Sequence, residues 1–180
     1  MAHSQHNNFP ERLKMAYRNK TYVIFDGDEN MWAYAYMKGW KQSEHIDFDF
    51  HDAHDLKPIS GTSTEEAVKK VLRHRLANTK QAIVVVGDKT KNLFRFVRWE
   101  IEMCLDMGIP IVVVNLNGKK IIDAELCPAI LRGTCSIHVP FKAKAIQFAL
   151  DDFVDNFATY KAKPLYDLYL KPETYATLGL

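Results

Sequence analysis

The stretch that decides the fold is residues 81–117, QAIVVVGDKTKNLFRFVRWEIEMCLDMGIPIVVVNLN. It opens with an apolar, β-branched run at residues 82–86 and closes with a second such run at residues 109–114. Continuous apolar runs of this kind are typical of parallel strands that are covered on both faces. The segment between them has helical spacing and ends near Gly108 and Pro110. The stretch therefore predicts a right-handed β-α-β crossover inside an α/β sheet.

One residue of the expected helix breaks its amphipathic pattern. On a wheel of about 100° per residue, the apolar arc contains Leu93, Phe94, Phe96, Val97, Ile101, Cys104 and Leu105, and the opposite side carries Arg95, Arg98, Glu102 and Asp106. Glu100 lies inside the apolar arc. A carboxylate there must find a partner, line a cleft or have a raised pKa. Glu100 is therefore the first candidate functional residue, and the structural alternative is a buried salt bridge, for example with Lys89 or His51.

The remaining chain alternates in the same way between expected strands and helices. Strands are expected at residues 21–25, 46–51 and 135–139, and helices at 31–40, after a cap at Ser63 or Thr64, and at 141–157. Residues 121–132 read as a short helix or an irregular connection. This order predicts an α/β, flavodoxin-like or Rossmann-like three-layer sandwich with a central, mostly parallel five-stranded sheet. We expect a polar arm at residues 1–19, one domain at 20–160, and an extension at 161–180 that packs on the domain or on a partner.

Composition excludes several classes of function. The 180 residues suit one domain, with 47% hydrophobic and 26% charged residues. The net charge of +2 gives no electrostatic reason to expect a nucleic-acid or membrane partner. We expect no signal peptide and no membrane span, because no apolar run is long enough. The three cysteines form no CxxC pair, which favours reduced thiols and a cytoplasmic location.

Polar residues follow the first two expected strands. Asp26 and Asp28 come after the first strand, and His51 and Asp52 end the second. The carboxyl ends of parallel strands are where open α/β sheets bind ligands. The plainer interpretation of the first group is a helix cap by Asp28 or Asn30. The sequence HDAHD at residues 51–55 contains metal-ligand residue types but no known ligand spacing, so we expect no metal there.

Known catalytic motifs leave one metal-dependent alternative. The chain has no P-loop, no GxGxxG after its first strand and no GxSxG elbow. The Asp-x-Asp pair at Asp26 and Asp28 resembles that of Mg²⁺-dependent phosphatases or small nucleases. However, Glu29 and Asn30 stand where a Thr or Val is expected after such a pair, and this hypothesis does not explain Glu100.

Three segments together resemble a known family. They are YVIFDGDENMWAYAYMKGW (residues 22–40), IDFDFHDAHDL (46–56) and TKQAIVVVGDKTKNLFRFVRWEIEMCLDMGIPIVVVNLN (79–117). In the last one Phe96 precedes Glu100 by four positions, which places both side chains on one helix face. Toll/interleukin-1 receptor (TIR) domains carry an aromatic residue and a glutamate at this spacing on the same helix. The three segments resemble, in order and spacing, the ThsB-type TIR proteins of the Thoeris antiphage defence system.

The resemblance implies an enzyme that consumes NAD. Such proteins cleave the nicotinamide–ribose bond and make a cyclic ADP-ribose-type signal, which activates a separate nucleotide-sensing effector. The expected catalytic residue is Glu100, and the expected substrate-binding residues are Phe25, Asp26, Asp28, Trp32, His51, Asp52, Lys89 and Phe96. NAD is then a substrate, no metal is expected, and a homo-oligomer is possible.

Two features depart from the family pattern, and one non-enzymatic alternative stays open. Phe96 stands where a tryptophan is usual in TIR domains, although it keeps the aromatic character. The DGDE turn at residues 26–29 is acidic, which disfavours direct contact with phosphates there. Because many TIR domains only assemble with partners, a TIR-like adaptor is the alternative function.

Overall fold

The central feature of the protein is a parallel sheet, seen in a computed structural model that describes residues 20–46, 48, 51–52, 64–92 and 95–180. Within these residues the sheet has the order β2-β1-β3-β4-β5-β6, and every neighbouring pair is parallel. The strands are β1 (Lys20–Ile24), β2 (His51–Asp52), β3 (Gln81–Val86), β4 (Ile111–Asn115), β5 (Ser136–Pro140) and β6 (Leu168–Tyr169). The α/β fold and the expected crossover are confirmed, and the C-terminal extension adds a sixth, two-residue strand.

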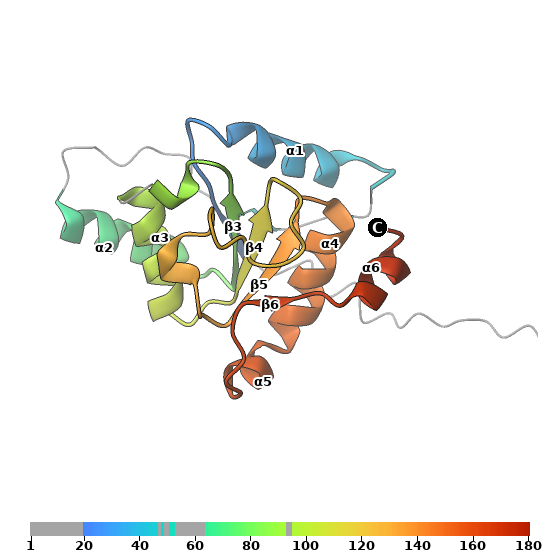
Figure 1. Ribbon diagram of the computed structural model, residues 1–180. Helices are drawn as coiled ribbons and strands as arrows, with labels where there is room; N and C mark the ends of the chain where they lie inside the picture. The colour runs from blue at the N-terminus through green and yellow to red at the C-terminus, as the bar shows by residue number, and fades with distance from the viewer. Residues whose placement is uncertain (1–19, 47, 49–50, 53–63, 93–94) are drawn as a thin grey trace, which may run out of the picture.

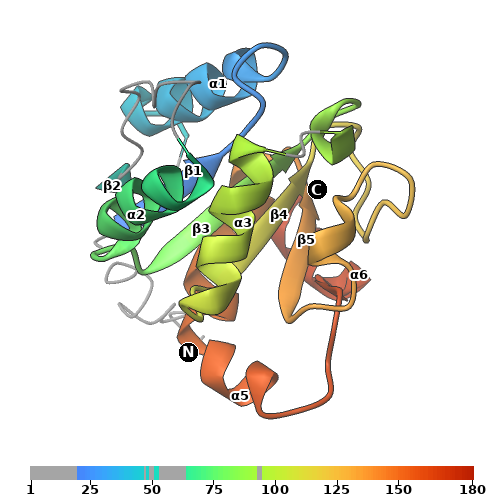
Figure 2. The same ribbon diagram turned by 90° about the vertical axis from the view of Figure 1, so that its left-hand side faces the viewer.

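Helices cover both faces of this sheet. The α-helices are α1 (Met31–Gln42), α2 (Glu65–Leu76), α3 (Phe96–Asp106), α4 (Ala143–Phe148), α5 (Phe157–Lys161) and α6 (Pro172–Leu178). Figure 1 shows α2 and α3 on one side of the sheet and α4 on the other. In Figure 2 the sheet is turned toward the viewer, and α3 runs in front of β3 and β4. No helix in the described ranges is long and apolar enough to cross a bilayer.

The two cores follow from the alternation of side chains along each strand. Tyr22 and Ile24 of β1 point into the core beneath α2 and α3. Val23 of β1, and Phe25 just beyond it, point into the core beneath α1 and α4. All four side chains are buried, with exposed fractions of 7% or less. Neighbouring residues of β1 thus point to opposite faces of the sheet.

Two expected elements differ from the structure. The strand expected at residues 46–51 is limited, among the described residues, to the two-residue edge strand β2. Phe48 is buried beside Trp40 instead, with ring centroids 5.5 Å apart. The helix expected at 141–157 begins as α4, passes through a π-helical segment at Ala149–Phe153, and gives way to α5. The N-terminal arm, residues 53–55 of HDAHD, Leu93 and Phe94 lie outside the described residues.

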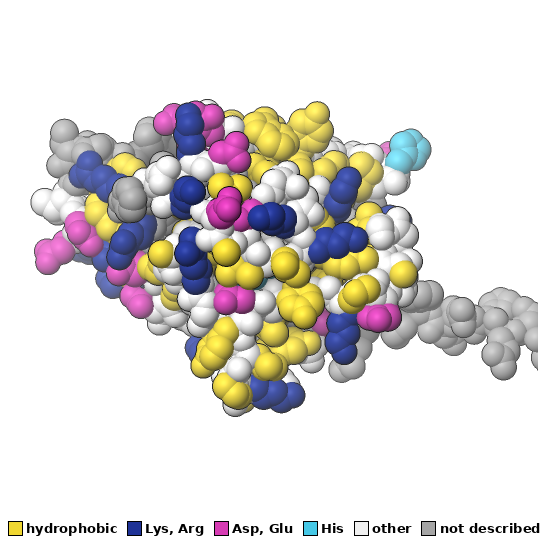
Figure 3. All heavy atoms as spheres, in the orientation of Figure 1, with side chains coloured by type: hydrophobic (Ala, Val, Ile, Leu, Met, Phe, Trp, Pro, Cys, Tyr) yellow, Lys and Arg dark blue, Asp and Glu magenta, His cyan; other side chains and the backbone are white. Residues whose placement is uncertain are grey.

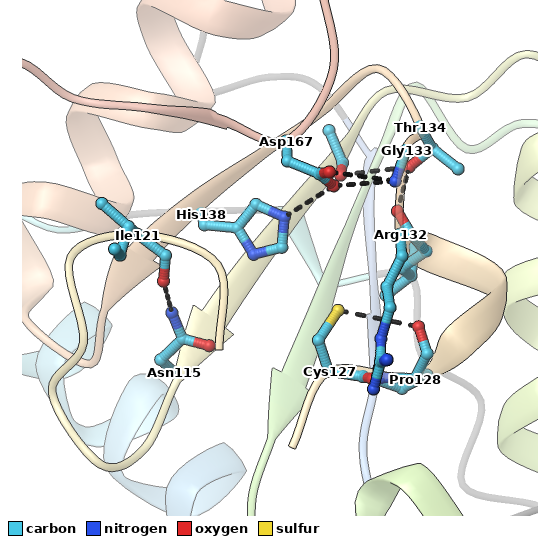
Figure 4. A network of polar contacts seen from close by, with 11 residues as sticks. Asn115, Ile121, Cys127, Pro128, Arg132, Gly133, Thr134, His138 and Asp167 are labelled. Carbon is cyan, nitrogen blue, oxygen red and sulfur yellow. Dashed lines mark hydrogen bonds and ion pairs between the residues drawn. The ribbon is translucent and has the colours of Figure 1, made fainter. Parts of the chain in front are cut away.

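The C-terminal extension lies against the far edge of the sheet. Leu168 and Tyr169 pair with Ile137 and His138 of β5. Figure 4 shows Asp167, just before β6, between His138 and Gly133. The Asp167 carboxylate accepts hydrogen bonds from the Gly133 backbone N–H at 3.0 and 3.1 Å, and one of its oxygens lies 3.6 Å from His138 Nε2. Residues 161–180 therefore form part of the same α/β unit.

Candidate functional site

Glu100 lies on the inner side of α3, as the helical pattern predicts. The Tyr22 hydroxyl donates a hydrogen bond to Glu100 Oε1 at 2.8 Å. Tyr22 comes from β1 and is fully buried, whereas Glu100 is only partly buried. Arg75, from the last turn of α2, is also partly buried and acts electrostatically on both groups. A strand and two helices thus converge on one carboxylate.

The environment of Glu100 changes its acidity. Burial raises the pKa of Glu100 from 4.5 to about 7, because a charged carboxylate is poorly solvated there. The Tyr22 hydrogen bond and the positive charge of Arg75 oppose this rise in pKa. Burial also raises the pKa of Tyr22 well above its usual range, so the phenol stays a proton donor. Glu100 therefore changes its protonation state near neutral pH.

Only one carboxylate oxygen of Glu100 has a hydrogen-bond partner among the described residues. Tyr22 binds Oε1, and Oε2 accepts no hydrogen bond within the described part of the chain. Some polar side-chain atoms of the described residues are fully buried and have no hydrogen-bond partner, but Oε2 is not one of them. Glu100 as a residue is partly exposed, and Oε2 is the carboxylate oxygen that has no partner among the described residues. The alternative pairing of Glu100 with Lys89 is not formed, because Lys89 forms an ion pair with Glu29.

A separate pocket lies at the carboxyl end of the sheet, beyond the neighbouring strands β1 and β3. In the strand order β2-β1-β3-β4 the chain leaves β1 toward β2 and leaves β3 in the opposite direction, toward β4. Doubly wound sheets bind ligands at such switch points. This carboxyl-edge pocket has a volume of about 440 Å³. It is lined by Glu29, Asn30 and Trp32 after β1, by Gly87, Asp88 and Lys89 after β3, and by Leu116 and Asn117 after β4.

Hydrogen bonds join the two loops that border the carboxyl-edge pocket, after β1 and after β3. Asn30 Nδ2 donates a hydrogen bond to Thr90 Oγ1 at 3.3 Å, and Thr90 Oγ1 also accepts one from the Gly87 backbone N–H at 2.9 Å. Asn30 and Thr90 are both buried. Asn30 occupies the N-cap position of α1 but makes no capping hydrogen bond with its side chain. The prediction that the Asn30 side chain caps α1 is therefore wrong, because its amide group joins the two loops instead.

The acidic turn after β1 uses its first carboxylate internally. Asp26 is buried, and its Oδ1 accepts hydrogen bonds from the backbone N–H groups of Asp28 and Glu29 at 3.0 and 3.3 Å. Asp28 itself is exposed. Lys89, one of the expected substrate-binding residues, forms an ion pair with Glu29. No group of three potential metal-binding side chains occurs in the described residues.

The aromatic candidates differ in what their rings are free to do. Phe25 is buried and stacks on Tyr34, with ring centroids 4.9 Å apart. Phe96 is partly buried and packs edge-on against Trp99 at 5.8 Å. Trp32 is 47% exposed and lines the carboxyl-edge pocket. Of the aromatic candidates, Trp32 is therefore the one that presents a ring to a pocket.

The expected site residues do not all come together. Glu100 faces the core beneath α2 and α3, on the side of Tyr22, and it does not line the carboxyl-edge pocket. Trp32 lies at the edge, on the helix that covers the opposite face. The register pairs His51 with Lys20 and Asp52 with Thr21. Asp26 lies six residues beyond Lys20, roughly 20 Å along an extended chain, so the backbone positions of Asp26 and His51 are not neighbours.

The sequence did not reveal the two groups that act on Glu100, the Tyr22 hydroxyl and the Arg75 charge. Tyr22 sits in an apolar strand run, where a tyrosine reads as a core residue. Arg75 reads as part of a solvated basic face of α2. The available signal was the hydroxyl of Tyr22, because a buried phenol usually finds a hydrogen-bond partner. Nothing in the pattern indicates that this partner is Glu100, 78 positions away.

Comparison with known families identifies this region. The family model of the Thoeris protein ThsB, TIR-like domain, matches residues 22–121, which include Tyr22, Arg75, Glu100 and much of the carboxyl-edge pocket. A comparison with curated proteins gives no match. The family match confirms the resemblance noted from the three sequence segments. Since it covers more than half of the 180 residues, the chain belongs to the Thoeris ThsB family and carries its TIR-like domain.

Proposed function

We propose that this TIR-like defence module cleaves the nicotinamide–ribose bond of NAD and releases a cyclic ADP-ribose-type signal. One observation carries the proposal: Tyr22 fixes one carboxylate oxygen of Glu100, and the other accepts no hydrogen bond from the described residues. The signal nucleotide would then activate a separate effector protein. The family match supports a role in bacterial antiphage defence, and the cleavage chemistry rests on Glu100.

The chemistry requires only one carboxylate. When the bond between C1′ of the ribose and the nicotinamide nitrogen breaks, the electron pair leaves with nicotinamide as a neutral molecule. The ribose becomes oxocarbenium-like, and a carboxylate in a poorly solvated site stabilises that positive charge. Glycosidases use carboxylates against a similar transition state, normally in pairs. Because nicotinamide needs no proton to leave, Glu100 alone suffices.

The second half of the reaction releases a proton. Water attacking C1′ gives ADP-ribose, and a nucleophilic atom of the same nucleotide attacking C1′ gives a cyclic product. In both cases the attacking atom loses a proton, and the Glu100 carboxylate, with a pKa of about 7, is a suitable base near neutral pH. The same residue thus stabilises the cation first and accepts the proton afterwards.

A non-enzymatic adaptor is the second candidate, and the surface of α1 favours it. Met31, Trp32 and Tyr36 are exposed by 43%, 47% and 60%. Figure 3 shows hydrophobic side chains gathered over this helix. Exposed apolar groups of this kind often mark contact surfaces between proteins. A Mg²⁺-dependent phosphatase or nuclease is disfavoured, because the Asp26 carboxylate already binds two backbone N–H groups.

The test is the release of nicotinamide from NAD. The protein is expressed in bacteria that are then challenged with phage, and both lysates and purified protein are assayed for nicotinamide and for NAD-derived nucleotides by mass spectrometry. We expect Glu100→Gln to lower product formation by at least about 100-fold. The matched control is Glu102→Gln, two residues along α3, where the glutamate pairs with Lys69 at 2.8 Å. If Glu100→Gln protects infected cells as well as the wild type does, the adaptor function is correct.

A further inference from the structure

The hydrogen bond between β1 and α3 gives Tyr22 a role that its sequence context does not reveal. Tyr22 has an exposed fraction of 0%, yet its hydroxyl reaches Glu100 Oε1 at 2.8 Å. Its backbone is fixed by strand pairing, since Tyr22 lies opposite Ala82 of β3. The phenol is therefore a rigid donor, with its ring packed in the core beneath α2 and α3. A rigid donor restricts the rotamers of the flexible glutamate side chain.

The charged and titratable groups around Glu100 are few in the described residues. Tyr22 faces it from β1, Arg75 from α2, and Cys104 from the next turn of its own helix. Burial raises the pKa of the Cys104 thiol far above neutral, so Cys104 brings no charge. Lys69 of α2 is engaged by Glu65 and Glu102, each at 2.8 Å. Arg75 is therefore the positive charge that acts on Glu100, and Tyr22 is its hydrogen-bond donor.

We propose that Tyr22 is a positioning residue for Glu100, which it orients so that Oε2 faces the substrate. The inference rests on the proposed NAD cleavage. Its physical reason is preorganisation: a carboxylate already fixed in the reactive orientation loses no rotational freedom when the transition state forms. Tyr22 acts through Glu100 and need not touch the substrate.

The experiment compares Tyr22→Phe with Tyr175→Phe. Both variants remove one hydroxyl from a buried tyrosine and keep the ring, but the Tyr175 hydroxyl has no hydrogen-bond partner among the described residues. The first readout is the titration of Glu100, followed by NMR of the full-length protein with isotope-labelled glutamate carboxyl groups. The second readout is the pH dependence of kcat and KM for NAD. Arg75→Met provides a third variant, which retains an apolar stem.

The expected results differ between these variants. In Tyr22→Phe the Glu100 titration moves up by about one pH unit, because a donor to the charged form is lost. The pH profile of kcat moves to higher pH in the same way. The value of kcat at pH 7 falls by about tenfold, and KM changes little. Arg75→Met shifts the titration in the same direction. Tyr175→Phe leaves the Glu100 titration and both kinetic constants at their wild-type values.

Two outcomes separate this inference from the proposed function. If Tyr22→Phe matches Tyr175→Phe in both the titration and the pH profile, the positioning role is wrong even though NAD is cleaved. If neither the wild type nor any variant cleaves NAD in phage-challenged cells, the proposed function is wrong, and the positioning role for that reaction falls with it. The NMR titration then still decides whether Tyr22 controls the Glu100 carboxylate.

Discussion

A Cβ atom added to Gly87 would lie 2.7 Å from Asn30 Oδ1, so the Asn30 side chain fills the space that a larger residue at position 87 needs. The Asn30 amide cannot move aside without breaking its hydrogen bond to Thr90. We therefore expect Gly87→Ala to lower the free energy of unfolding by about 1–3 kcal/mol, the usual cost of overpacking. Urea denaturation measures this change.

Gly39→Ala is the matched control for Gly87→Ala. Gly39 lies inside α1, and a Cβ atom there would meet nothing within 4 Å. Since alanine favours a helix over glycine by about 1 kcal/mol, this variant is expected to be more stable than the wild type. If both variants gained stability, the packing between Asn30 and Gly87 would not be tight enough to shape the carboxyl-edge pocket.

Much of the fold was predictable because its signals are local. The β-branched runs at residues 82–86 and 109–114 are buried strands, and the cap expected at Thr64 is present, with its side chain accepting a hydrogen bond from the Ala67 N–H at 3.3 Å. The alternating run at 46–51 misled, because Phe48 packs against Trp40 and the described strand starts only at His51. The contact between Trp40 and Phe48 is a tertiary one, and the periodicity of the sequence does not reveal it.

The site was predictable only in part, for a similar reason. Helical spacing was enough to show that Glu100 points inward. It did not indicate the strand or the helix that Glu100 meets, since the Tyr22 contact depends on how α3 crosses the sheet. The carboxyl ends of strands were a sound guide to the pocket at Trp32 and Lys89. For His51 the structure gives only the backbone register, which places it opposite Lys20 at the start of β1.

Glu100→Gln is expected to change how stability depends on pH. Glutamate titrates at 4.5 when unperturbed and at about 7 in the folded protein. The folded state therefore keeps a proton that the unfolded chain releases, and stability falls as the pH rises from 4.5 through about 7. The difference corresponds to about 3 kcal/mol as an upper limit. Glutamine cannot ionise and still accepts the Tyr22 hydrogen bond, so the variant should be more stable than the wild type at pH 8.5 but similar at pH 4.

Urea denaturation at several pH values measures this difference, and subtracting the two curves removes the titration of all other groups. Glu102→Gln is again the control, because Glu102 pairs with Lys69 at 33% side-chain exposure. It should lose a small, nearly constant amount of stability above pH 5. A constant offset for Glu100→Gln as well would mean that the Glu100 carboxylate is solvated in the folded protein.

Trp32→Ala tests whether the carboxyl-edge pocket binds part of the substrate. The Trp32 ring lines this pocket and touches Tyr36 and Phe141 edge-on, at 5.9 and 5.5 Å. Base stacking on an aromatic side chain contributes about 1–3 kcal/mol, so we expect KM for NAD to rise about tenfold with kcat little changed. Tyr36→Ala is the control, since Tyr36 is exposed on the same helix and does not line the pocket. An equal rise in KM for both variants would indicate a general effect on α1 rather than stacking.

His138→Gln is expected to remove an acid sensitivity of the C-terminal extension. His138 has an exposed fraction of 0%, and burial lowers its pKa even though the nearby Asp167 carboxylate acts in the opposite direction. An unfolded histidine gains a proton below about pH 6.5, whereas His138 in the folded protein stays neutral to lower pH. The unfolded state then binds more protons, so stability falls as the pH drops below 6.5. Glutamine cannot be protonated, so the difference in stability between variant and wild type should change steadily in favour of the variant as the pH falls.

Unfolding curves at pH 7.5, 6.5 and 5.5 test this change, with His74→Gln as the control on the exposed side of α2. Hydrogen exchange in β6 and α6, corrected for the intrinsic effect of pH, shows where the loosening occurs. We expect exchange there to increase first, because Asp167 joins this segment to Gly133 and His138. If β6 instead stays protected at pH 5.5 while the rest of the sheet exchanges, Asp167 must bind protonated His138 strongly enough to offset its burial.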